Sequence, residues 1–229
     1  MRDFIVKILL RLGLYRPMIA FINQIKFKQQ VRKMRKNGLE MLQMADQAFT
    51  SMGVQAFLTF GTLLGAYRDK GFIAYDPDVD LGVIDGNLPK NMYEVMAKHG
   101  FQLCKQNIIS ETNQVIEDTY IYKGIHLDVF HYFEAEDDYY TLVAQLHETK
   151  DWKEANATDG FPCEKVSVVK TEFQRQNFMN IEVYMPIKTH EWLVDMYSES
   201  YMTPIKNWSE DDHKTRRSKS TERSYRKLY

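Results

Sequence analysis

Three aspartates alternate with Pro77 and Val79 in the segment Asp76-Pro-Asp-Val-Asp80. In an extended chain, alternate side chains point to the same face about 6.5–7 Å apart, so this segment places three carboxylates side by side. Val79, Leu81 and Val83 continue as the buried face of a strand. An acidic surface turn is the simpler alternative, but it does not account for this apolar alternation. Like charges on one face raise one another's pKa values. The pattern therefore predicts a bound cation, and ligands that are all oxygen indicate Mg²⁺ or Mn²⁺.

A fourth carboxylate, Asp128, stands in the apolar segment 125–133, which reads as another strand. A carboxylate inside such a strand costs free energy unless it is paired or coordinated. A salt-bridged core aspartate is the alternative; the sharper interpretation is a further metal ligand that also accepts the proton of an attacking hydroxyl. His126 and His131 fall on opposite faces of this strand, and we expect both to be packed side chains rather than ligands.

The Gly61-Thr62 pair ends an apolar strand over residues 54–60 and opens a short helix. Free backbone N–H groups at such a turn can bind a phosphate, although many strand–helix turns contain the same pair. Arg68 and Lys70 follow and can neutralise phosphate oxygens, while a solvated turn explains Lys70 equally well. A phosphate-binding turn beside clustered carboxylates predicts metal-dependent displacement at phosphorus.

The order of elements predicts an α+β fold with a mixed sheet. Lys123-Gly124 joins two of the strands as a hairpin turn. The expected helices are residues 37–52, 62–68, 90–98, 139–152 and 188–199, and the expected strands are 54–60, 78–83, 101–105, 114–122 and 125–133.

Charge divides the chain into three parts. Residues 1–36 carry a net charge of +9, residues 213–229 carry +6, and the chain as a whole carries −1. The strongly acidic body between the ends argues against nucleic-acid binding. We expect residues 1–36 to form two short amphipathic helices, with Pro17 starting the second, that bind either an anionic membrane surface or the acidic body. The basic tail is expected to be a disordered, solvated end.

Composition and targeting signals indicate which class of protein this is and where it is expected to be located. The apolar fraction of 44% and charged fraction of 27% are those of a globular protein. Two cysteines cannot form a disulfide framework or a four-cysteine zinc site. The apolar run near the N-terminus is broken by Lys7 and Arg11, so no signal peptide is expected. These observations predict a cytoplasmic protein, peripheral on the inner face of the membrane if its basic ends bind lipid.

The segments 61–68, 70–73 and 76–82, together with Leu127-Asp-Val-Phe130, resemble the LicD/fukutin family. A C-terminal stretch from Met185-Pro186 to Pro204 extends the resemblance, which covers roughly residues 37–205. The resemblance implies a nucleotidyltransferase-like mixed β-sheet flanked by helices. It also implies transfer of a phospho-alcohol, such as phosphocholine, ribitol phosphate or glycerol phosphate, from a CDP-alcohol donor to a glycan or its lipid-linked precursor.

Matched to the family's motif, Gly61 and Thr62 correspond to the phosphate loop, Asp78 and Asp80 to the paired metal ligands, Asp76 to their upstream carboxylate, and Asp128 to the carboxylate of a neighbouring strand. Pro77 interrupts the usual acidic run, and Ser198-Glu199 replaces an expected glycine. These departures leave the transferred alcohol open.

The expected organisation is a basic N-terminal extension (1–36), a catalytic domain (37–205) and a basic tail (206–229). Two alternatives remain: a nucleotidyltransferase that uses a nucleoside triphosphate, and an inactive relative that binds glycan or membrane.

Overall fold

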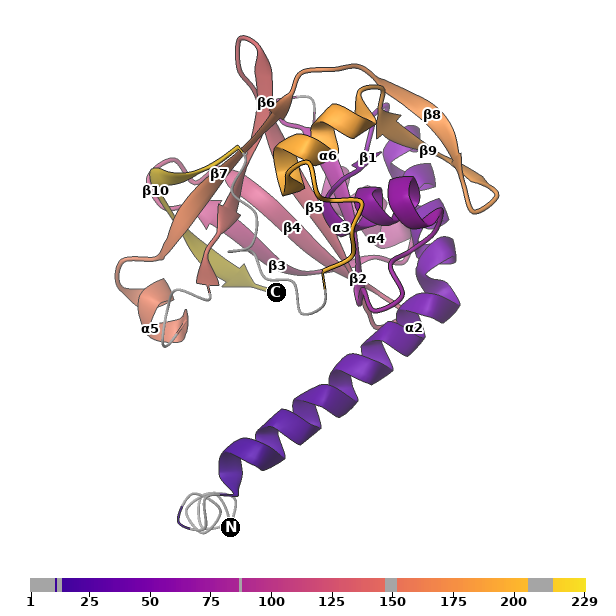
Figure 1. Cartoon of the computed structure of the whole chain (residues 1–229). Coiled ribbons are helices and arrows are strands. Elements are labelled where there is room, and N and C mark those ends of the chain that lie inside the picture. The colour runs from indigo at the N-terminus through magenta and orange to yellow at the C-terminus, as the bar shows by residue number, and fades with distance from the viewer. Residues whose placement is uncertain (1–10, 12–13, 87, 147–151, 206–215) are drawn as a thin grey trace.

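The computed structural model describes residues 11, 14–86, 88–146, 152–205 and 216–229. Their strands form one large mixed sheet with helices against it, as the sequence predicts (Figure 1). The strands are β1 Phe57–Leu58, β2 Asp78–Ile84, β3 Gln102–Ile109, β4 Val115–Tyr122, β5 Ile125–Glu134, β6 Asp138–Ala144, β7 Phe161–Val169, β8 Phe173–Phe178, β9 Ile181–Pro186 and β10 Arg217–Leu228.

The strand order is β4-β3-β10-β7-β6-β5-β2-β1-β9-β8, and β4 also pairs with β5. This extra pairing closes a ring of strands from β5 through β4, β3, β10, β7 and β6 back to β5. Strand β2 lies outside this ring and pairs with β5 in parallel. Strand β1 then pairs antiparallel with β2 and parallel with β9. The sheet is therefore mixed at the place where the aspartates of β2 lie.

The described helices are α2 Tyr15–Ser51, α3 Phe60–Leu64, the π-helix η1 Gly65–Asp69, α4 Met92–Lys98, α5 Trp152–Ala157 and α6 Thr189–Tyr197. The C-terminal half of α2 packs on the sheet, with Met41, Leu42 and Phe49 fully buried. Trp192 of α6 packs against Phe57 of β1 in the core, with their ring centroids 5.6 Å apart. These contacts hold β1 and β2 in the core.

The N-terminal part differs from the expectation of two short helices. From Tyr15 onward α2 is one continuous helix, and its first half projects away from the sheet (Figure 1). Pro17 lies in the first turn, where its missing N–H has no helical partner to lose, so it does not break the helix. The expected boundary between residues 36 and 37 falls inside α2. The first expected helix lies almost wholly outside the described residues. None of the helices in the described ranges is long and apolar enough to span a membrane.

Two other expectations were wrong. Residues 139–152 were expected to be helical, but Asp138–Ala144 form the strand β6. Its tyrosine, threonine and valine side chains favour a pleated, half-buried strand. The basic tail, expected to be a solvated end, forms β10 over Arg217–Leu228 between β3 and β7. By contrast, the hairpin at Lys123-Gly124 is confirmed: both residues have positive φ, 49° and 76°, as a tight turn between β4 and β5 requires.

Candidate active site

The three aspartates of the predicted cation site come together. Asp78 and Asp80 lie on β2, and Asp76 lies in the loop before it; one carboxylate oxygen from each falls within 4.8 Å of the others. Asp80 is buried, and the other two are half-buried. Among the described residues no ion pair joins any of the three to a basic side chain. The cluster is thus a concentration of negative charge that no basic side chain of the described residues contacts in an ion pair.

The electrostatics of the cluster follow from this arrangement. Burial first, and then the neighbouring Asp76, raise the pKa of Asp78 to about 8, although the Lys105 ammonium opposes the rise. Burial and the other carboxylates hold the pKa of Asp80 well above its usual range, and burial also raises the pKa of Asp76. A cation bound between these oxygens would reverse the shifts, since opposite charge favours the ionised form.

Gly61 and Thr62 start α3 directly beside the carboxylates. The Thr62 backbone N–H donates to Asp80 Oδ2 at 3.4 Å, and its hydroxyl accepts the Asp80 N–H at 2.9 Å. A Cβ at Gly61 would lie 2.5 Å from Asp76 Oδ2 and 3.3 Å from Asp80 Oδ2, so only glycine leaves this space open. Thr62 therefore holds Asp80 in place, and the missing side chain of Gly61 allows the Asp76 and Asp80 carboxylates to lie close to the backbone of α3.

The backbone that leads into this turn is strained. Phe60 has a φ of 41°, a left-handed conformation that is uncommon for an aromatic residue. Its ring packs against Phe130 of β5 at a centroid separation of 4.4 Å, which holds the turn. Strain of this kind is concentrated at functional sites, where the surrounding packing maintains it.

A cavity of about 430 Å³ opens over the cluster. Asp76, Asp78, Asp80 and Gly61 line it together with aromatic side chains from distant elements. Phe27 of α2, Tyr197 of α6 and Tyr201 are among these. A concave, largely apolar site of this size with a few charged groups suits a small organic ligand.

The two predicted phosphate-binding cations differ in position. Arg68 of η1 lines the cavity, but its Nε and Nη2 donate to the Asp69 carboxylate at 2.8 and 2.9 Å. Lys70 is exposed, is not among the cavity-lining residues, and donates from Nζ to the Tyr67 carbonyl at 2.8 Å. The structure thus places Arg68 in the cavity that the carboxylates line and leaves Lys70 outside it, which favours the solvated-turn interpretation of Lys70.

Asp128 lies next to the cluster rather than in it. Parallel pairing of β2 with β5 sets Asp80 directly opposite Asp128, so their side chains leave the sheet on the same face. Asp128 is absent from the three-carboxylate group and from the cavity lining. It accepts a short hydrogen bond from the Thr119 hydroxyl and lies 4.0 Å from Lys105 Nζ. Burial raises its pKa to about 7, and the Lys105 ammonium opposes the rise.

His126 and His131, the two histidines of β5, form hydrogen bonds within the protein. His131 is buried and bonds Asp118 at 3.0 Å and Asp85 at 3.2 Å through its two ring nitrogens. Burial lowers its pKa, but the two carboxylates more than compensate and raise the value to about 9. His126 bonds Gln30 of α2 at 3.3 Å. Neither is in the described carboxylate group.

Several lining residues were not predicted as site residues, although Tyr197 and Tyr201 lie within the 185–204 stretch of the family resemblance. Tyr197, Tyr201 and Arg217 come from segments more than 115 residues beyond Asp80 in the chain. Arg217 lies in the segment that was interpreted as a solvated tail. A period-two pattern of Ser and basic residues from 217 onward was the available signal, and the density of charge obscured it.

The structure is a mixed sheet with paired aspartates on one strand. The start of a short helix lies directly beside these aspartates and lines the same cavity, an arrangement consistent with a nucleotidyltransferase-like α+β fold. The chain belongs to the LicD/fukutin family: it matches the family described as LicD/FKTN/FKRP, nucleotidyltransferase domain, over residues 53–186.

Two curated relatives resemble most of the chain. Mouse ribitol-5-phosphate transferase FKTN is 28% identical over 197 residues, which is 85% of this chain and 40% of that protein. Human ribitol-5-phosphate transferase FKTN is 27% identical over the same shares. The chain therefore spans less than half the length of the curated relatives that it matches.

Proposed function

We propose that the protein transfers a phospho-alcohol from a CDP-alcohol donor to a hydroxyl of a glycan or its lipid-linked precursor, with Mg²⁺ or Mn²⁺ as cofactor. The observation that carries this proposal is the cluster of three carboxylates, within 4.8 Å of one another, on the wall of a ligand-sized cavity. Membership of the LicD/fukutin family supports the reaction class, and the similarity to ribitol-5-phosphate transferases supports transfer of an alcohol phosphate.

The residues present fit a hard divalent cation. Asp76, Asp78 and Asp80 offer only oxygen ligands, which Mg²⁺ and Mn²⁺ prefer. Burying these carboxylates without compensation is costly, since each shift of one pKa unit corresponds to about 1.4 kcal/mol. Such an ion, when bound, would neutralise charge on the phosphate oxygens and polarise the phosphorus.

The remaining groups supply orientation and proton transfer. Thr62 fixes Asp80 through two hydrogen bonds, and Gly61 lets the Asp76 carboxylate approach the backbone of α3 closely. Asp128 is the candidate base for the acceptor hydroxyl. Its side chain leaves the sheet beside that of Asp80, and burial raises its pKa to about 7, which suits proton transfer near neutral pH. The aromatic wall of the cavity can stack against a pyrimidine base and exclude water.

Product analysis tests the proposal. With Mg²⁺, a glycan acceptor pool and CDP-ribitol, CDP-choline or CDP-glycerol, we expect acceptor-dependent release of CMP. The alternative, nucleotidyl transfer from a nucleoside triphosphate, would release pyrophosphate and leave the CDP-alcohols untouched. CMP and pyrophosphate are therefore assayed separately in each reaction. Release of neither product with any donor would favour the inactive glycan- or membrane-binding relative.

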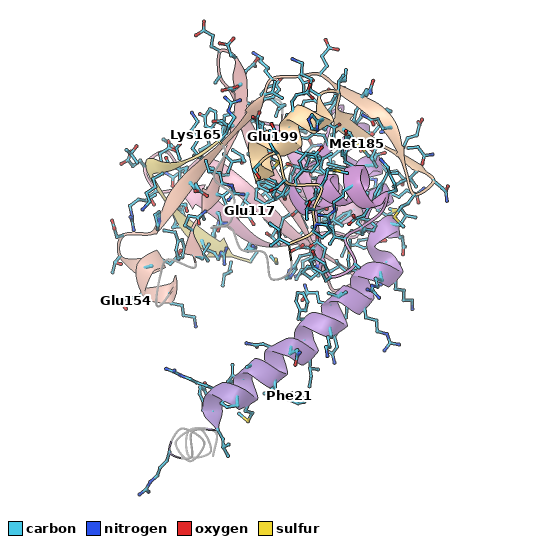
Figure 2. All side chains as sticks on the ribbon, viewed as in Figure 1. Phe21, Glu117, Glu154, Lys165, Met185 and Glu199 are labelled. Carbon is cyan, nitrogen blue, oxygen red and sulfur yellow. The ribbon has the colours of Figure 1, made fainter. Side chains whose placement is uncertain are left out.

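The projecting half of α2 supports a second, accessory proposal: contact with an anionic membrane surface on which a lipid-linked acceptor would lie. Phe21, Ile22 and Ile25 are exposed on one face, and basic residues such as Lys26 and Lys28 accompany them. Figure 2 shows Phe21 on the part of α2 that extends away from the sheet. Apolar side chains that insert and basic ones that meet anionic headgroups, each worth about 1 kcal/mol, describe an interfacial helix.

Replacing Phe21 and Ile25 together by serine should weaken binding to phosphatidylserine vesicles several-fold and leave the fold intact. Point substitutions suit the test better than removal of residues 1–36, because Met34 is buried in the core. Ile187→Ser, at another exposed apolar position, is the matched control. Vesicle co-sedimentation at low and high salt gives the measurement. If the unaltered protein does not bind these vesicles at low salt, the membrane proposal is wrong and the projecting part of α2 has another partner.

A further inference from the structure

Arg217, the first residue of β10, brings a buried cation to the candidate active site. It lines the cavity together with Asp76, Asp78 and Asp80, although β10 pairs with β3 and β7 and not with β2. Its side chain is 2% exposed. The strand that completes the ring therefore also supplies a charged group to the wall of the cavity.

The hydrogen bonds of Arg217 leave donor capacity unused. Nη1 donates to Glu164 Oε2 of β7 at 3.1 Å. Nε is buried and has no hydrogen-bond partner among the described residues. A guanidinium has five N–H donors and carries its charge at every physiological pH, so a buried Nε–H without an acceptor is costly. An anionic oxygen entering the cavity would satisfy it.

The neighbours of Arg217 connect it to the carboxylates. Burial raises the pKa of Tyr132 and of Tyr197; the Asp80 carboxylate adds to each rise, and the Arg217 guanidinium opposes it. The Asp80 carboxylate and the Arg217 guanidinium therefore both act electrostatically on the hydroxyl groups of Tyr132 and Tyr197. Arg68, the other arginine of the cavity, already uses two of its nitrogens on Asp69. Arg217 is the guanidinium whose geometry leaves a buried donor for a ligand.

We propose that Arg217 binds the diphosphate group of the donor, a role that rests on the proposed function. A diphosphate spans several ångströms and carries charge on both phosphates. One phosphate can lie against the carboxylate-held cation while the other accepts hydrogen bonds from Arg217, as guanidinium groups do in phosphate recognition. The alternative is a purely structural ion pair with Glu164.

Ligand binding separates these two roles. Calorimetry with CDP, inorganic pyrophosphate and cytidine, in EDTA and again with Mg²⁺, is applied to Arg217→Gln, Arg217→Lys and Glu164→Gln. Arg217→Gln should weaken CDP and pyrophosphate binding about ten- to hundredfold and leave cytidine binding unchanged. Arg217→Lys should be intermediate, because it keeps the charge and loses the Nε donor. Glu164→Gln should bind CDP within about threefold of the unaltered protein, since the guanidinium remains.

Several outcomes would overturn the assignment: CDP binding that is unchanged in Arg217→Gln, an equal loss in Glu164→Gln, or an equal loss for cytidine. If Arg217→Gln fails to fold, the comparison of Arg217→Lys with Glu164→Gln decides, because both keep a polar side chain in place. Arg217-dependent CDP binding without any CMP release would support this assignment while rejecting the proposed transfer reaction. CMP release together with CDP binding that does not depend on Arg217 would support the proposed transfer reaction and reject the role of Arg217.

Discussion

Asp80→Asn is expected to reduce CMP release at least about a thousandfold while making the metal-free protein more stable, because catalysis and folding make opposite demands on this side chain. Asparagine keeps the size of the side chain and an oxygen that can accept the Thr62 N–H. It removes a charge that is needed to hold a divalent cation.

The stability gain follows from the direction of the pKa shift. Burial and the neighbouring carboxylates hold the pKa of Asp80 above its unfolded value. Above that unfolded pKa, an ionised Asp80 opposes folding, and the penalty disappears only as the pH falls and the group takes up a proton. Removing the charge should therefore raise the midpoint of thermal unfolding at pH 7 in EDTA by a few degrees.

Asp85→Asn is the matched control, since Asp85 follows the same strand but bonds His131 instead of the cluster. His131 favours the ionised form of Asp85 and lowers its pKa, so this substitution should lower stability and leave CMP release intact. Calorimetric unfolding and the CMP assay, each with Mg²⁺ and with EDTA, give the comparison. Full turnover by Asp80→Asn, or by the unaltered protein in excess EDTA, would reject the metal assignment.

Ser224→Pro is expected to destabilise the protein by about 3 kcal/mol or more, a large fraction of the stability of an ordinary domain. Ser224 is fully buried and pairs with Ile109 of β3 on one side and with Phe161 of β7 on the other. Proline cannot donate to either ladder and is tolerated mainly at sheet edges. Loss of pairing here opens the ring of strands.

Ser224→Ala separates the effect of the backbone from that of the hydroxyl, because it keeps the N–H and changes only the side chain. It should change the free energy of unfolding, measured in urea, much less than Ser224→Pro does. A Ser224→Pro protein that unfolds at the same urea concentration as the unaltered protein would show that residues 217–228 are dispensable to the fold. Because Arg217 enters the cavity from the same strand, Ser224→Pro should also weaken CDP binding.

The core of the candidate site was predictable because its information is local. Alternation along 76–83 predicts a strand and a grouping of three carboxylates. The structure has the strand at Asp78–Ile84 and brings the three carboxylates together, although Asp76 reaches them from the loop before the strand. The same holds for the Lys123-Gly124 hairpin and for the helix that ends before Gly100, where φ is 89°. Each depends on neighbours within a few residues, so the pattern and the structure share one physical cause.

Other parts of the candidate site could not be predicted from local sequence patterns. The position of Asp128 beside Asp80 follows from the register of β2 and β5, whose residues are 48 positions apart. Its bond to Thr119 and its proximity to Lys105 follow from pairings across β3, β4 and β5. Glu117 of β4, labelled in Figure 2, belongs to the same polar group, because it pairs with Lys105 Nζ at 3.1 Å. No local pattern encodes which strands become neighbours.

By itself, the sequence determined the family resemblance, the α+β class and the carboxylates of β2, because strand alternation and turn chemistry act over short distances. Only the tertiary structure decided that Lys70 lies outside the cavity, that the charged segment 217–228 is a central strand, and that Arg217 faces the same cavity as Asp80. The reason is that β10 gains its hydrogen bonds from β3 and β7, more than 45 residues away in the chain. Such pairing overrides a local composition that favours solvent.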